Sequence, residues 1–254
     1  MLKGETGNMT EEQLFVEIIK EAGMGKTGFD IQTLLQHIQN IQLYALLENC
    51  VAAHCNIVIG GPAPELKVEL LRHLSFSIAP DESISLYEDN QQFNHDKINL
   101  MRKCHDYVAD KDYSHSQFIK AALKMNTSWT LLPQLQEPDM QLWLGALSTG
   151  MKFITAMELD DAEKLPDRVC SGIQNTGCDA DAEHINRAVY DFIDVVVLVD
   201  YAAPGRPQIT QAAFYDRENG TNTCTVLYDR ENGKNLEQIP ERLSRRFLKS
   251  GTDD

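Results

Sequence analysis

The feature of this sequence that most limits its possible folds is a series of short, mostly apolar runs that alternate with amphipathic segments. A strand with apolar side chains on both faces must be covered on both, as parallel strands between helices usually are. The pattern therefore predicts an α/β fold with a mainly parallel sheet and helices on both faces. The predicted strands lie at 56–60, 83–87, 129–132, 153–157 and 194–199, and the helices between them at 66–75, 115–125, 138–148 and 182–193.

Two segments precede this series. Residues 10–22 carry apolar residues at helical spacing, and the Gly-rich stretch at 23–28 ends that helix, so residues 1–30 are predicted to form a helical arm or linker. Asp30 can cap a long helix over 31–54, which leads directly into the first strand. Residues 31–254 are then predicted to form one core with a short basic helix at its C-terminal end.

The hexapeptide YDRENG occurs twice, at 215–220 and 228–233, each time at the end of a strand-like run. Asn-Gly supplies the positive φ angles of tight hairpin turns. We therefore expect an antiparallel hairpin appended to the parallel sheet. Six residues repeated at a distance of thirteen indicate duplicated turn chemistry rather than a solenoid.

Composition limits the ligands and the location. With 254 residues and 43% hydrophobic residues the chain can bury one sizeable core, and its formal charge of −15 would repel DNA and anionic lipid, so direct nucleic-acid binding is not expected. No apolar run approaches the roughly 20 residues that span a bilayer, and the first residues resemble no signal peptide, so we expect a cytoplasmic protein. The cysteines have no metal-ligand spacing and are expected to be reduced, mostly buried thiols: Cys50, Cys55, Cys104, Cys170, Cys178 and Cys224.

The stretch GMGKT at 23–27 is similar to a phosphate-binding loop but lacks its context. Such a loop follows a strand and opens a helix, so that backbone N–H groups converge on the phosphates, and its full spacing is G-x-x-x-x-G-K-[ST]. Here a helix precedes the motif and position 20 is a lysine. A glycine that ends a helix explains the stretch fully.

The segment NIVIGGPAPELKVELLRHL, at 56–74, has the right context and the wrong chemistry. It joins a buried strand to an amphipathic helix, where a phosphate loop belongs. Pro62 and Pro64 have no N–H to donate, and Glu65 adds a negative charge where phosphate would lie. Taken alone, the segment reads as a plain strand-turn-helix connection.

The order of several segments resembles the motor ATPases of bacterial type II and type IV secretion and conjugation. Residues 56–74 align with the family's apolar strand and S-G-G-T-G-S-G-K-T-T-L-L, which places Gly61 at the first loop glycine, Lys67 at the phosphate-binding lysine and Val68 at the Mg²⁺-binding threonine. APDESISLYED is similar to P-P-D-E-R-I-V-T-I-E-D and puts Glu88 at the family's acidic residue near the nucleotide.

Later segments continue the resemblance, which spans about residues 31–233. Residues 121–150 are similar to the family's Walker B segment, with Pro133 and Gln134 in place of its glycine and glutamate. Residues 149–165 resemble its histidine box, with Met151 and Met157 in place of the two histidines, and 185–220 resemble its closing strand and hairpin. The resemblance implies a RecA-like P-loop core, with the family's usual N-terminal domain either absent or reduced to the first 30 residues.

These departures predict a vestigial nucleotide site formed by Gly61, Lys67, Val68, Glu88 and Gln134. Valine has no oxygen for a metal ion, and the amide of Gln134 cannot polarise water as a carboxylate does. We expect no catalytic residue, no metal and no cofactor, with ATP and Mg²⁺ required only if the site is active. On the simplest interpretation Lys67 is a solvated surface lysine and Glu88 a strand-end carboxylate. Gln134, Met151 and Met157 are then only packing or surface residues.

Three hypotheses follow. The first is a non-hydrolysing subunit of a secretion, conjugation or pilus machine, which acts in assembly or regulation with copies of itself or an active paralogue, next to inner-membrane components. The second is an active, divergent ATPase that uses Lys67 for phosphate and Glu88 or a nearby acid for the metal. The third is a binding module with an unrelated doubly wound fold.

Overall fold

The computed structural model describes residues 41–88, 104–108, 114–203, 206–236 and 238–250. The predicted arm at 1–30, with its helix at 10–22 and the Gly-rich stretch at 23–28, lies outside the described residues. Of the long helix predicted over 31–54, residues 41–54 are described. They are helical as α3 (Ile41–Ala52), which ends two residues before the predicted end.

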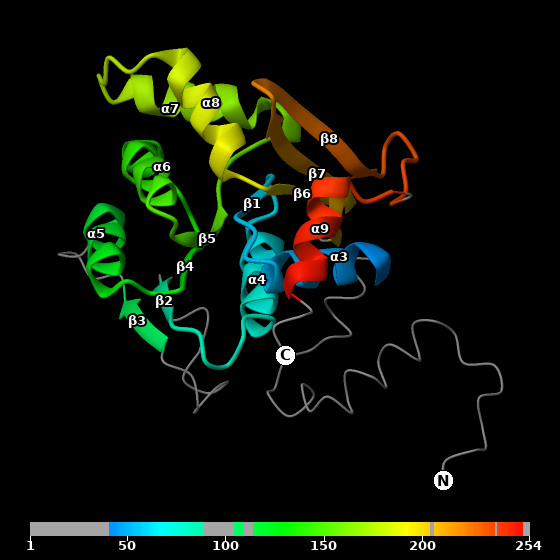
Figure 1. Cartoon of the computed structure of the whole chain (residues 1–254), viewed down its shortest axis with the longest axis horizontal. Helices are drawn as coiled ribbons and strands as arrows, with labels where there is room; N and C mark the ends of the chain where they lie inside the picture. Colours follow the sequence, from blue (N-terminus) through cyan, green and yellow to red (C-terminus); the bar gives the residue numbers. More distant parts are fainter. Residues whose placement is uncertain (1–40, 89–103, 109–113, 204–205, 237, 251–254) are drawn as a thin grey trace, which may run out of the picture.

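The described strands form one eight-stranded sheet in the order β3-β2-β4-β5-β1-β6-β7-β8 (Figure 1). The strands from β3 to β6 are parallel, and β7 and β8 are antiparallel additions at one end. The predicted mainly parallel sheet with a C-terminal hairpin is confirmed. The strands are β1 (Ile57–Gly60), β2 (Ile84–Glu88), β3 (Cys104–Val108), β4 (Trp129–Leu132), β5 (Lys152–Ala156), β6 (Val195–Ala203), β7 (Arg206–Glu218) and β8 (Thr221–Asp229).

Helices cover both faces of the sheet because the central strands are apolar on both. Ile57 and Ile59 of β1 pack into one buried cluster, whereas Val58 between them packs into the other. The first cluster includes side chains of α3, α4 (Pro64–Phe76) and α9 (Glu241–Ser250). The second lies under α5 (His115–Met125), α6 (Met140–Ser148), α7 (Leu165–Asn175) and α8 (Ala182–Phe192), and Figure 1 shows the two groups of helices on either side of the strands.

Two elements escaped the sequence pattern. β3 has the polar sequence CHDYV and lies at the edge of the sheet, where no continuous apolar run is required. α7 contains Pro166, Ser171 and Gly172, which weaken a helical pattern, but its buried residues Leu165, Val169 and Ile173 recur every four positions. That spacing was the available signal for a helix. Short 3₁₀ turns, η3 (Glu137–Asp139) and η4 (Ala162–Lys164), precede α6 and α7.

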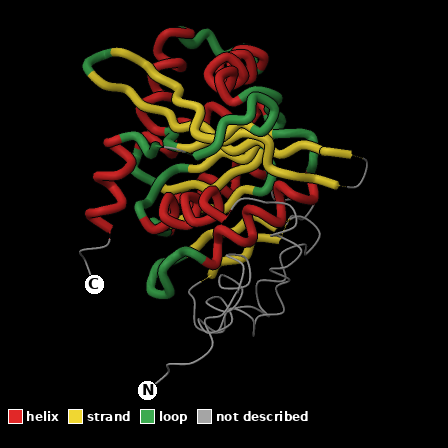
Figure 2. Tube along the Cα trace, turned by 90° about the vertical axis from the view of Figure 1, so that its right-hand side faces the viewer, coloured by secondary structure: helices red, strands yellow, loops and turns green. Residues whose placement is uncertain are grey.

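The two copies of YDRENG adopt different structures. In the first, Asn219 and Gly220 have φ angles of 51° and 82° and form the tight turn between β7 and β8, as predicted. In the second, Asp229 ends β8, its carboxylate accepts a hydrogen bond from the Asn232 backbone N–H at 2.9 Å, and its backbone pairs with Lys234. Figure 2 shows the tip of the β7–β8 hairpin projecting beyond the helices.

Asn56 joins the amino ends of the three central strands. Its side-chain oxygen accepts a hydrogen bond from the Phe153 N–H in β5 at 2.9 Å, and its amide donates to the Phe192 carbonyl at 2.7 Å. Its backbone N–H donates to the carboxylate of Asp194, just before β6, at 2.8 Å. Asp194 also accepts a hydrogen bond from Arg246 of α9, so the C-terminal helix is fastened to the same point.

We expect Asn56→Ala to lower the free energy of unfolding by about 2–4 kcal/mol, because the buried Phe153 N–H and the part-buried Phe192 carbonyl lose their partners at about 1–3 kcal/mol each. Urea denaturation measures the change. Asn175→Ala is the control, since Asn175 is exposed and makes a hydrogen bond of 3.3 Å to Glu137, and it should cost less than about 0.5 kcal/mol. Equal losses in the two variants would show that Asn56 does not have this role.

His73 is a buried titratable group on α4, with 2% of its surface exposed. Its ring lies against Tyr44, and its Nε2 shares a hydrogen bond with the Tyr44 hydroxyl. Burial, with a smaller contribution from the charge of Arg72, lowers the pKa of His73 from 6.5 to about 3. The imidazole is therefore neutral in the folded protein at physiological pH.

This pKa shift predicts a pH dependence of stability. Between pH 6.5 and about 3 the unfolded chain protonates His73 and the folded chain does not, so stability is complete above pH 6.5 and falls with pH through that window. The slope from this group approaches about 1.4 kcal/mol per pH unit. Chemical denaturation of wild type and His73→Gln between pH 7 and pH 4 measures it, and the exposed His184→Gln serves as control. An unchanged slope in His73→Gln would contradict the assignment.

Candidate functional site at the β1–α4 turn

The turn between β1 and α4 lies against β6 so closely that only glycine fits at its start. Gly61 has a φ of +117°, and a Cβ placed there would lie 1.8 Å from the Val199 carbonyl oxygen. Residues 56–74 have the predicted strand-turn-helix structure. The packing of the turn on β6 is enough to require Gly61, without any phosphate.

The start of α4 offers few donors to a ligand. Pro64 occupies the first helical position, and Ala63 before it provides no side-chain cap. Neither Pro62 nor Pro64 has an N–H, and Leu66 is fully buried in the core. The Lys67 N–H already bonds to the Ala63 carbonyl at 3.1 Å, the first bond of the helix. A helix start that binds phosphate uses the N–H groups of its first turn, which have no partner inside the helix. At the start of α4 one of these N–H groups is missing because Pro64 has none.

Lys67 is buried and paired, which differs from the solvated lysine of the simplest interpretation. Its Nζ donates to Glu158 Oε1 at 2.7 Å and lies 3.4 Å from the Met157 carbonyl oxygen. The side chain of Lys67 is 7% exposed, whereas that of Glu158 is 67% exposed. Val68 is half-buried and packs against the apolar cluster of α3 and α4. The cation of the turn is therefore neutralised from within the chain.

Glu65, the other charged side chain of the turn, is held by β6. The Tyr201 hydroxyl donates to Glu65 Oε1 at 2.7 Å, and this hydrogen bond is the main reason why the pKa of Tyr201 is raised. Tyr201 lies on the exposed extension of β6 beyond Val199, where the sequence predicted that the strand would end. The turn is thus fastened on one side to the end of β5 and on the other to β6.

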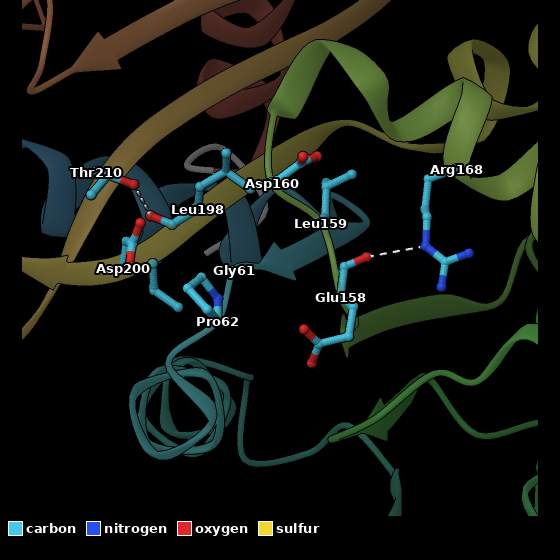
Figure 3. A pocket seen from close by; sticks show the side chains of 10 residues that line it. Gly61, Pro62, Glu158, Leu159, Asp160, Arg168, Leu198, Asp200 and Thr210 are labelled. Atoms are coloured by element: carbon cyan, nitrogen blue, oxygen red, sulfur yellow. Dashed lines mark hydrogen bonds between the residues drawn. The ribbon is translucent and has the colours of Figure 1, made fainter.

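A pocket of about 370 Å³ opens beside the turn, at the carboxyl ends of β1 and β5 and along the middle of β6 (Figure 3). Three carboxylates line it, from Glu158, Asp160 and Asp200, against the single guanidinium of Arg168. Arg168 donates to Glu137 at 2.6 Å and to the Glu158 carbonyl at 3.3 Å. The pocket is negative overall, so it favours cations over phosphate.

The structure brings only some of the predicted site residues to this pocket. Gly61 lines it, and Lys67 contacts Glu158 at its wall. Gln134 is exposed and follows β4, on the far side of β5 from β1. Glu88 is the last residue of β2, which is farther from β1 than β4 is.

The methionines of the histidine-box segment are buried packing residues. Met157 follows β5, its N–H donates to the Ile59 carbonyl at 3.0 Å, and 1% of its surface is exposed. Met151 lies just before β5, at the amino end of the strand, whereas the pocket lies at its carboxyl end. Neither side chain is available to a ligand in the pocket.

Sequence reasoning missed three residues that shape the site: Glu158, Arg168 and Tyr201. Glu158 follows the predicted strand at 153–157, and the rule that ligands bind at the carboxyl ends of parallel strands could have found it. Arg168 lies on the helix that the pattern missed, and Tyr201 lies beyond the predicted strand end. Within the described ranges no three His, Cys, Asp or Glu side chains are arranged to hold a metal ion. No helix of the described part is long and apolar enough to cross a membrane.

No protein-family model and no curated protein sequence matches the chain, but solved structures do. The VirB11 ATPase from the Brucella suis type IV secretion system, in complex with sulphate, matches 82% of this chain with 18% identity and a TM-score of 0.57. The pilus retraction motor PilT with bound ADP matches 82% of this chain with 13% identity and a TM-score of 0.51.

These matches establish the fold. The chain has the RecA-like α/β fold of secretion and pilus ATPases, as the resemblance implied, and the hypothesis of an unrelated doubly wound fold is wrong. The matched region spans 57% of the VirB11 chain and 60% of the PilT chain.

The pairing of Lys67 predicts an order of mutational effects. In Glu158→Ala a buried ammonium loses its carboxylate, and we expect a loss of about 1–2 kcal/mol, limited because water can reach the space left by this exposed side chain. Lys67→Met removes the charge and keeps the packing, so it should change stability by less than about 1 kcal/mol. Thermal and urea unfolding measure both.

Asp160→Asn is the matched control, since Asp160 lines the same pocket and is exposed, and no hydrogen bond or ion pair of its side chain is present in the described part of the chain. It should be close to neutral. If Lys67→Met destabilised the protein more than Glu158→Ala does, the ion pair with Glu158 would not account for the contribution of Lys67 to stability.

Proposed function

We propose that this chain is a non-hydrolysing subunit of a bacterial secretion, conjugation or pilus machine, in which a RecA-like core serves assembly or regulation. The carrying observation is that both charged side chains of the β1–α4 turn are already paired within the chain. Lys67 is paired with Glu158, and Glu65 with Tyr201.

Electrostatics support this proposal. To bind a triphosphate, Lys67 would have to leave Glu158, and the phosphates would enter a pocket that also contains Asp160 and Asp200. A hydrogen bond from a backbone N–H to a charged oxygen is worth roughly 1.5–3 kcal/mol, and the two prolines of the turn can donate none. One lysine, which must first be freed from a carboxylate, does not offset these losses.

The residues that would support hydrolysis are also missing from their expected places. Val68 has no oxygen to hold Mg²⁺, and its half-buried side chain packs against the core. Gln134 is an amide where a general base would be needed, and an amide does not accept a proton from water at neutral pH. We therefore assign no catalytic residue and no cofactor.

On this proposal the surfaces of the core carry the function. The partners would be further copies of the chain or an active ATPase of similar fold, at the cytoplasmic side of inner-membrane components. The large negative charge makes a direct contact with nucleic acid unfavourable.

The alternative is an active, divergent ATPase, favoured by a lysine at position 67 beside a pocket at the carboxyl ends of the strands. Binding would then require a rearrangement that separates Lys67 from Glu158. Lys67 would hold the phosphates, and Glu88 or a nearby acid would hold Mg²⁺. The chain would then power secretion or DNA transfer.

We expect titration calorimetry with ATP and Mg²⁺ to give no binding heat up to about 1 mM ATP, because the paired Lys67 and the carboxylates of the pocket oppose phosphate binding. A dissociation constant above about 1 mM corresponds to a binding free energy of less than about 4 kcal/mol. Phosphate release should equal that of buffer. Lys67→Ala should give the same result and the same oligomeric mass as wild type. Low-micromolar binding or turnover by wild type that Lys67→Ala abolishes would establish the active ATPase instead.

A further inference from the structure

The outer edge of β8 is the border of the sheet, and no other strand of the described part of the chain pairs with it (Figure 1). One end of this edge is the turn at Asn219 and Gly220. The other end is closed where the backbone of Lys234 pairs with Asp229. Between these limits lies a short, open strand edge.

The outward backbone groups of this edge follow from the hairpin geometry. In a two-residue hairpin the residues that flank the turn, Glu218 and Thr221, bond to each other, so the next residue directs its N–H and C=O outward. Alternation then directs the backbones of Asn222, Cys224 and Val226 outward, and a bulge after Val226 ends the regular edge. These three residues are placed symmetrically about Cys224.

The side chains of the edge lack the usual protection against pairing. Residues 221–227, TNTCTVL, contain no charge and no proline, and four of the seven are β-branched, which favours a strand. Natural edge strands usually carry a lysine, an inward charge or a proline. In a chain with a net charge of −15, an uncharged edge is where a second copy can approach with least repulsion.

We propose that two copies of this chain pair along β8, antiparallel and with Cys224 on the two-fold axis, so that one sheet continues through both. This register sets Asn222 opposite Val226 of the other copy. The outward N–H and C=O groups of each strand then lie opposite those of the other and can form hydrogen bonds. The interface is isologous and closes at two copies.

Charges at the ends of the edge suit the same arrangement. The hairpin tip carries the exposed acid Glu218, and the turn after β8 carries two exposed bases, Arg230 and Lys234, against one exposed acid, Glu231. In the two-fold pairing the tip of one copy meets the turn after β8 of the other, at both ends of the interface. This inference uses the β8 edge alone, and it stands or fails independently of nucleotide binding.

The register makes a specific demand on Thr223 and Thr225, both exposed on the face of β8 away from α8. Each Thr223 lies directly opposite Thr225 of the other copy, about 4.5 Å away between Cα atoms. We expect wild type to sediment as a dimer or a multiple of a dimer. Thr223→Lys/Thr225→Lys sets like charges opposite each other and should weaken association at least tenfold.

Thr223→Lys/Thr225→Glu is the matched variant. It changes the same two positions but sets opposite charges across the axis, so it should retain the wild-type association constant within about threefold. Far-UV circular dichroism and melting temperature check that each variant folds. A monomeric wild type, or equal weakening by the two double variants, would overturn the proposal and leave a strand of another protein, or none, as the partner of β8.

Cysteine pairs give a second measurement in a Cys224→Ser background. A mixture of Thr223→Cys and Thr225→Cys chains should form an intermolecular disulfide under mild oxidation, because facing Cα atoms about 4.5 Å apart fit a disulfide. Neither variant alone should do so, since identical positions lie on a diagonal of roughly 7–8 Å. Cross-linking of either variant alone at the rate of the mixture would contradict this register.

Discussion

A buried ammonium group constrains the whole β1–α4 region. Lys67 projects from the first turn of α4, its side chain is 7% exposed, and a buried ammonium group needs a negative partner. A phosphate-binding protein leaves the place of that partner for its ligand. Here the carboxylate of Glu158 occupies that place. β5 ends at Ala156, and the side chain of Glu158, two residues later, extends to Lys67. The chain therefore supplies the counter-charge that would otherwise come from outside.

The rest of the turn is consistent with this internal closure. Gly61 is needed because the turn packs on Val199, and Tyr201 holds Glu65 from the extended part of β6. Leu66 and Val68 pack into the core, so the start of α4 is stabilised by apolar contacts. With 13% and 18% identity to PilT and VirB11, the chain keeps the architecture of these proteins.

Sequence patterns predicted the central strands, whose burial is complete, and missed a strand at the sheet edge and a helix that contains proline and glycine. The strands at 56–60, 129–132 and 153–157 are buried throughout, so nearly every residue in them is constrained to be apolar, and their bounds were predicted within one residue. β3 at the sheet edge carries no such constraint. Of the site, Gly61 and Lys67 could be placed by their position after a strand. The contact between Tyr201 and Glu65 could not, because it joins residues 136 positions apart and depends on how far β6 extends.

The duplicated hexapeptide shows how tertiary context decides the structure of identical residues. In the first copy Asp216 continues β7, its carboxylate accepts from Arg242 of α9, and the turn comes three residues later. In the second, Asp229 ends its strand, because its own carboxylate binds the N–H of Asn232 and competes with further pairing. The two outcomes set both limits of the β8 edge. The two hexapeptides thus bound a strand of defined length, and residues 221–227 between them carry no charge.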